Sequence, residues 1–119
     1  MLAKLSLIKL YNFGQYKTII IDMTIYALSS GAGVSGVAVI RVSGAGTKEI
    51  IKSIIKDELP TPRLATLKKI NKINTSEQID EGLLLWFPGP ESYTGEDMAE
   101  LHVHGSIAVI RSILDQLSN

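Results

Sequence analysis

The 119-residue chain contains no cysteine and carries no net charge. Without cysteine it can form no disulfide bond, supply no catalytic thiolate and build none of the common zinc-finger patterns. Twelve lysine and arginine residues balance twelve aspartate and glutamate residues, so no overall basic field attracts the chain to nucleic acid. The 45% apolar content excludes a mainly disordered chain, and the length corresponds to about one domain. The mean hydropathy of +0.21 is high for a small monomer, so we expect a partner to cover part of the apolar surface.

Residues 1–22 differ in composition from the rest of the chain. They hold three lysines, one acidic residue and no arginine. Polar residues and Gly14 interrupt their apolar stretches, so no run reaches the roughly 18 residues of a membrane helix. No small-residue cleavage site follows an apolar core, which argues against secretion. We therefore expect a cytoplasmic protein, with no membrane partner, in which an extension of unknown role (1–22) precedes a domain at 23–119.

From residue 24 onwards the pattern interleaves strands and helices. The lysines of 64–70 suit a sheet edge, whereas the continuous apolar run GLLLWF (82–87) predicts a central strand buried on both faces. Thr47 is expected to cap the first helix, and Ser106 to open the last. The sequence predicts an α+β fold, with a single mixed β-sheet of about five strands and two to three helices. Strands are expected at 24–28, 37–42, 64–70, 82–87 and 98–104, and helices at about 47–56 and from 106 to the end, with Ile107, Ile110, Leu114 and Leu117 as the buried stripe of the last.

Two glycine-rich segments look like nucleotide-binding motifs but lack the required context. GAGVSG (31–36) matches G-x-G-x-x-G, yet a dinucleotide site needs that loop to open a helix, and the next segment reads as a strand. SGAGTKEI (43–50) lacks the spacing of a P-loop. We expect turns at both places, and no binding of GTP or ATP by this route.

Glu100, His102 and His104 alternate along the last expected strand and so share one of its faces. Two imidazoles and a carboxylate could ligate zinc, but the chain has no further histidine or cysteine to complete the set. We expect these residues to line a pocket or an interface. No metal site and no catalytic residue is predicted.

Two charged residues lie inside otherwise apolar strands. Arg41 shares a face with Val37 and Val39, and Glu100 lies on the face opposite Leu101. Either they are ordinary edge residues, snorkelling or paired with each other, or they form a pocket. Such a pocket would suit a ligand with an N–H donor edge and anionic or carbonyl oxygens. The residues alone leave both interpretations open.

Longer blocks of the sequence resemble the opening domain of the MnmE (TrmE) family of tRNA-modification GTPases. The specific blocks are the IRVSG strand and WFPGPESYTGEDMAELHVHG, in the order and spacing of that family. LPTPRLATL and the closing amphipathic helix also fit, so the resemblance covers Met23 to Asn119 and suggests Met23 as the usual start. The GAGVSG loop departs from the family, whose members more often carry proline and arginine there.

The resemblance implies a folate-binding domain of the aminomethyltransferase-like type that forms a homodimer. The folate-contacting arginine and glutamate of the family fall on Arg41 and Glu100, while a third contact, a lysine, lies beyond residue 119. The ligand would be 5-formyl- or 5,10-methylene-tetrahydrofolate, supplying a one-carbon unit. With the flavoprotein MnmG, full-length members form the 5-carboxymethylaminomethyl group on the wobble uridine of certain tRNAs.

The family's GTPase domain, which binds GTP, potassium and magnesium, has no counterpart in these 119 residues, so the chain alone should not hydrolyse GTP. Whether it is an enzyme in its own right stays open. Two alternatives also remain. One is an aminomethyltransferase-type folate-binding domain with another substrate, and the other is a dimerisation module whose folate site is dead.

Overall fold

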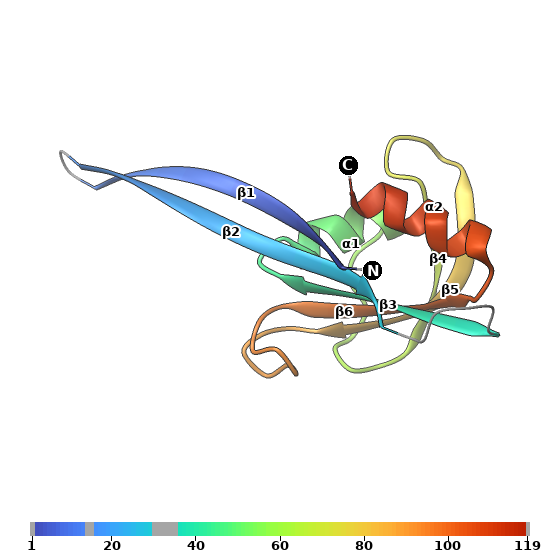
Figure 1. The fold of residues 1–119 in the computed structure, drawn as a ribbon. Coiled ribbons are helices and arrows are strands. Elements are labelled where there is room, and N and C mark those ends of the chain that lie inside the picture. The colour runs from blue at the N-terminus through green and yellow to red at the C-terminus, as the bar shows by residue number, and fades with distance from the viewer. Residues whose placement is uncertain (1, 14–15, 30–35, 119) are drawn as a thin grey trace.

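The computed structural model describes residues 2–13, 16–29 and 36–118, with side chains from Thr24 onwards (Figure 1). The glycine-rich turn expected at 31–36 falls outside these residues except for Gly36. Eight elements follow one another along the chain: β1 (Leu2–Phe13), β2 (Tyr16–Leu28), β3 (Val37–Gly44), α1 (Thr47–Ile55), β4 (Thr66–Asn71), β5 (Gln78–Phe87), β6 (Met98–His104) and α2 (Ile107–Leu117).

All six strands form one sheet, in the order β1-β2-β3-β6-β5-β4. The predicted α+β fold with one sheet is confirmed, and β4 lies at an edge as expected. The sheet is not mixed, however, because every strand pair is antiparallel. The links at 72–77 and 88–97 are shorter than the dozen or so residues that a parallel crossover needs, so β4, β5 and β6 must run as a meander.

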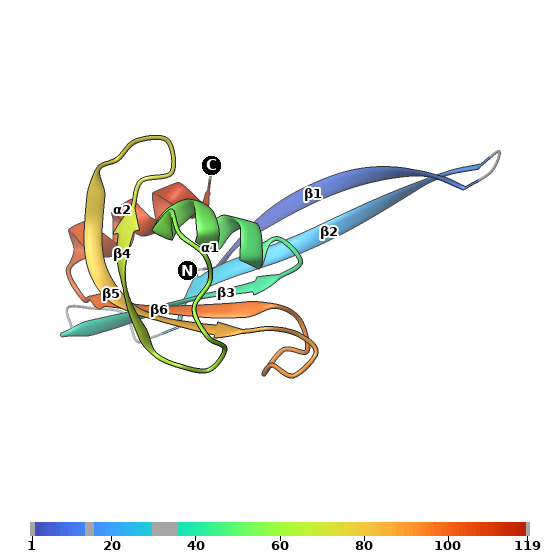
Figure 2. The same cartoon turned by 180° about the vertical axis from the view of Figure 1, so that it is seen from behind.

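Both helices pack on the same face of the sheet (Figures 1 and 2). Side chains from both helices and from five strands, β2 to β6, form the core between the two layers. On each strand these core residues alternate with residues of the opposite face, because successive side chains point to opposite sides. The largest apolar side chains that are fully buried are Ile40, Val42, Ile51, Ile54, Ile70, Leu84, Leu101, Ile113 and Leu117.

The opposite face of the sheet, here called the open face, is covered by neither helix (Figure 2). The prediction that β5 is buried on both sides is therefore wrong. Leu84 and Trp86 lie in the core, but Leu83 is 42% exposed on the open face, and Leu67 of β4 is 61% exposed beside it. The open face includes Val37, Val39, Arg41, Leu67, Leu83, Leu85, Phe87, Glu100 and His102.

Two details of the helices also differ from expectation. Gly46, not Thr47, is the N-cap of α1. Thr47 is the first helical residue, and its hydroxyl donates to the backbone oxygen of Asp97 at 3.2 Å instead of capping the helix. Ser106 caps α2 as expected. Of the predicted buried stripe, however, Ile107 in the first turn is exposed, whereas Ile113, which was not predicted to be buried, lies in the core. In the described part of the chain α1 has 9 residues and α2 has 11, so neither could span a membrane.

The segment we expected to be an extension forms β1 and the first half of β2. This hairpin projects from the two-layer body (Figure 1), and the molecule measures 55 × 28 × 27 Å. β1 pairs with β2 alone, whereas the pairing of β2 with β3 involves only Thr24–Leu28.

Deleting residues 1–22 should therefore leave a cooperatively folding domain, because the β2–β3 pairing and the core are retained. Thermal unfolding followed by circular dichroism tests this on a chain that begins at Met23. The matched control begins at Ser29 and should be strongly destabilised. It loses the buried Tyr26 and the Thr24 hydroxyl, which accepts from the Gly46 N–H at 2.7 Å. Loss of the cooperative transition in the Met23 chain would show that the hairpin is part of the fold.

Candidate functional site

Arg41 and Glu100 meet at the centre of the open face. The β3–β6 register places them directly opposite each other. The Arg41 guanidinium binds one carboxylate oxygen of Glu100, with Nη2 at 2.5 Å and Nε at 2.9 Å from Oε2. The two candidate site residues are therefore brought together as an ion pair, in which the Arg41 side chain is 40% exposed and that of Glu100 only 15%.

His102 contacts the second carboxylate oxygen of Glu100. It lies two residues further along β6, and its Nε2 is 3.1 Å from the second oxygen, Oε1. Burial by itself raises the pKa of Glu100, but hydrogen bonds from His102 and Arg41, together with their charges, outweigh it and lower the pKa below its usual value. Glu100 is therefore an ionised acceptor at neutral pH.

Most of the acceptor capacity of Glu100 is already in use. An ionised carboxylate offers about four acceptor positions. Arg41 donates twice to Oε2, and His102 contacts Oε1, which leaves about one position free. A ligand with two adjacent N–H groups can therefore bind both oxygens only if Arg41 moves off Oε2. Arg41 is then available for an oxygen of the same ligand.

The pair lies in a cleft of about 430 Å³, within the range typical of small-molecule sites. Besides Arg41 and Glu100, the cleft is lined by Phe87 at the end of β5, Met98 at the start of β6, and Tyr93. Apolar and aromatic walls around one carboxylate and one guanidinium suit a flat, polar-edged ligand.

No role was predicted from the sequence for residues 88–97, which lie between the strands expected at 82–87 and 98–104, so the contribution of Tyr93 to the cleft was missed. The sequence feature that could have identified Tyr93 is an aromatic residue inside a segment rich in glycine, proline and hydrogen-bonding side chains. Hydrogen bonds tie this loop down: Gly89 N–H donates to Asp97 Oδ1 at 2.9 Å, and Gly44 N–H donates to the Asp97 carbonyl at 2.9 Å. Arg63 also donates to the Glu91 carbonyl. The loop is thus fixed to the end of β3 and to the segment before β4.

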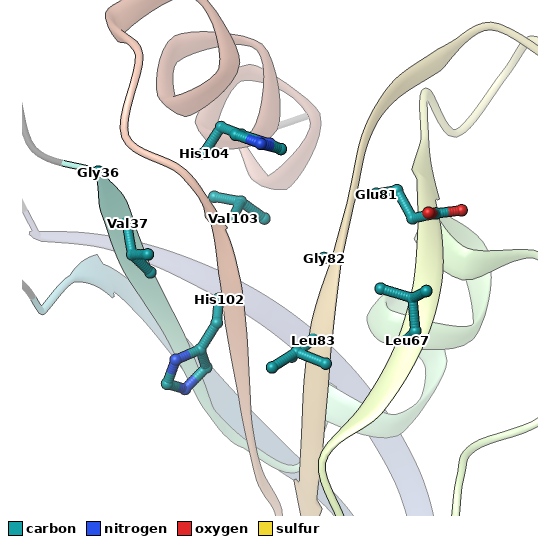
Figure 3. Close-up of a pocket in the computed structure, with 9 residues that line it drawn as sticks. All are labelled: Gly36, Val37, Leu67, Glu81, Gly82, Leu83, His102, Val103 and His104. Atoms are coloured by element: carbon teal, nitrogen blue, oxygen red, sulfur yellow. The ribbon is translucent and has the colours of Figure 1, made fainter.

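A second hollow of about 380 Å³ lies further along the open face (Figure 3). His102, Leu83 and Leu67 contribute to it from three neighbouring strands, β6, β5 and β4. His102 therefore lies between the two hollows. Strands β5 and β6 approach closely here because Gly82 has no side chain: a Cβ atom would lie 2.3 Å from the His102 carbonyl oxygen.

The two histidines and Glu100 share a strand face but do not converge. His104 turns to Asp80 of β5, with its Nδ1 2.8 Å from Oδ1 and its backbone N–H donating to Oδ2 at 2.9 Å. Burial raises the pKa of Asp80, but these hydrogen bonds outweigh it, so that the pKa is lowered overall. Among the residues with described side chains, no group of three or more histidines and carboxylates could hold a metal ion.

We compared the chain with known protein families and with individual proteins. The family model described as "GTP-binding protein TrmE N-terminus" matches residues 24–119. The tRNA modification GTPase MnmE of Pelagibacter ubique (strain HTCC1062) is 66% identical over 96 residues, which are 81% of this chain and 22% of that protein. The 5-taurinomethyluridine-[tRNA] synthase subunit GTPB3, mitochondrial, of Danio rerio is 50% identical over 98 residues, 82% of this chain and 19% of that protein. The chain thus spans about a fifth of the length of these relatives.

The lowered pKa values of Asp80 and Glu100 predict a loss of stability in acid. Between the folded pKa and the higher unfolded value, the unfolded chain binds more protons, so acid favours unfolding. The free energy of unfolding should be steady above the usual values, 3.8 for aspartate and 4.5 for glutamate, and fall as the pH drops below them. Urea denaturation at a series of pH values between 7 and 3 measures this. In Asp80→Asn and in Glu100→Gln the free energy of unfolding should fall less steeply with decreasing pH than in the parent chain. A decrease as steep as the parent's in both variants would show that these two carboxylates do not cause the loss of stability in acid.

Proposed function

The chain belongs to the family of TrmE N-terminal domains of MnmE-type tRNA-modification GTPases, and from this premise we propose that it binds a tetrahydrofolate derivative and forms a homodimer. The ligand is 5-formyl- or 5,10-methylene-tetrahydrofolate, which supplies a one-carbon unit when bound. The observation that carries the proposal is the Arg41–Glu100 pair in a cleft on an uncovered sheet face.

The hydrogen-bonding groups of the cleft match those of this ligand. A reduced pterin presents a ring N–H and an exocyclic amine side by side, and the two oxygens of a carboxylate match that edge. Glu100 is ionised and mostly buried, so bonds to it are charge-assisted and little weakened by water. Arg41, more exposed at the rim, can turn to a pterin, formyl or tail carboxylate oxygen. Phe87 and Met98 offer apolar walls for the ring.

The family to which the chain belongs also suggests the role of the full-length protein. We propose that the full-length protein acts in the cytoplasm with the flavoprotein MnmG to form the 5-carboxymethylaminomethyl group on the wobble uridine of certain tRNAs. GTP, potassium and magnesium belong to the GTPase domain of such proteins. The curated relatives bear names of tRNA modification GTPases and of a 5-taurinomethyluridine-[tRNA] synthase subunit, which supports a substrate of this kind. The alternative, an aminomethyltransferase-type domain with another substrate, would share the folate cleft but would not explain the similarity to tRNA-modification proteins.

Glu100→Gln should weaken the binding of 5-formyltetrahydrofolate roughly 30- to 150-fold. The amide replaces one acceptor by a donor, so that a ligand N–H faces another N–H at a cost of about 2–3 kcal/mol. Arg41→Lys should also weaken binding, because an ammonium cannot offer the planar fork. Titration calorimetry measures both, with Glu49→Gln on α1 as a control on the other side of the sheet. Binding by folded Glu100→Gln within twofold of the parent would refute the role of Glu100.

The homodimer is supported by the open face, which exposes aliphatic side chains that burial would stabilise. We expect a mass above the 12.9 kDa of one chain at micromolar concentrations in sedimentation. Leu83→Lys on the open face should weaken the association, because it places a charge within an apolar interface. Leu64→Lys, at an exposed position before β4, is the matched control. A constant monomer mass across this range would count against the dimer.

A further inference from the structure

Tyr93 is the most exposed of the large apolar side chains that the structure describes. It is 89% exposed and yet lines the Arg41–Glu100 cleft. A tyrosine that packs against the protein's own core would be largely buried, as Tyr26 is. An aromatic face left open beside a charged, hydrogen-bonding pair is available for a flat ligand.

The backbone on either side of Tyr93 is held in place. The hydroxyl groups of Thr94 and Ser43 are hydrogen-bonded at 2.8 Å, and Ser43 is a buried residue of β3, two positions from Arg41. On the other side, Ser92 donates to the Glu96 carbonyl, and its own carbonyl accepts from the Gly95 N–H at 3.2 Å. The loop is therefore anchored to the strand that carries Arg41. Only the two side-chain torsions of Tyr93 remain to be ordered, and a ring with few torsions loses little entropy on binding.

We infer that Tyr93 is the stacking residue of the cleft: its ring packs against the face of the flat heterocycle whose N–H edge Glu100 binds. The inference rests on the proposed folate function, and it adds the residue that selects for a flat ring. Glu100 recognises the edge of the ring and Tyr93 its face, so the two contacts are chemically independent. The Thr94–Ser43 bond positions Tyr93 and does not itself touch the ligand.

The test compares four substitutions in the 119-residue chain by titration calorimetry with 5-formyltetrahydrofolate. Tyr93→Phe keeps the ring and should bind within about twofold of the parent. Tyr93→Ala should weaken binding at least about fivefold, as alanine substitution does for a base stacked on an aromatic side chain. Tyr93→Leu should lose as much, since it is apolar but offers no flat face. Thr94→Val removes the Ser43 bond and should weaken binding less than Tyr93→Ala.

These outcomes separate the inference from the function on which it rests. Tyr93 is so exposed that its substitution should leave the melting temperature unchanged, which circular dichroism checks. If Glu100→Gln loses binding but Tyr93→Ala stays within twofold of the parent, the stacking role is wrong and the folate site stands. Full binding by Tyr93→Leu would also overturn stacking, leaving simple apolar cover. No binding either by the parent chain or by a longer chain that includes the family's lysine beyond residue 119 would overturn the folate proposal and this inference with it.

Discussion

The pairing of β3 with β6 is the constraint on which the candidate site depends. Its register sets Arg41 opposite Glu100, and the alternation of side chains turns both away from the core. A shift of either strand by one residue would turn its charged residue into the core and expose its core residue, Ile40 of β3 or Leu101 of β6, instead. The burial of that core by α1 and α2 therefore fixes the position of the ion pair, although neither charged residue contributes to the core.

Placing both helices on one face leaves the other as a surface on which a ligand and a partner can meet. The ion pair lies at the middle of this surface, with one hollow on each side of the Glu100–His102 contact. Because Arg41 occupies Oε2, the pair is satisfied without a ligand, and a bound ligand must exchange one set of hydrogen bonds for another. Affinity then depends on the difference between the two sets, so each contact beyond Glu100 matters.

The sequence predicted what local patterns determine. Alternation along β6 placed Glu100 and Leu101 on opposite faces, and the apolar spacing of α2 placed Leu114 and Leu117 in the core. It could not tell whether a second layer covers the far side of β5, because a continuous apolar run looks the same whether one face is buried or both. Nor could it show that the two charges touch, or that Tyr93 reaches the cleft. Those facts depend on strand register and on hydrogen bonds between residues some fifty positions apart.

The most direct test of the account is the side-chain Nε–H signal of Arg41 in a proton–nitrogen correlation spectrum, because that group donates to Glu100 Oε2 in the free chain. On titration with 5-formyltetrahydrofolate we predict a saturable shift of this signal, together with shifts of the backbone amides of Glu100 and its neighbours on β6. Saturable shifts confined to residues away from the open face, with the Arg41 signal unmoved, would contradict the account.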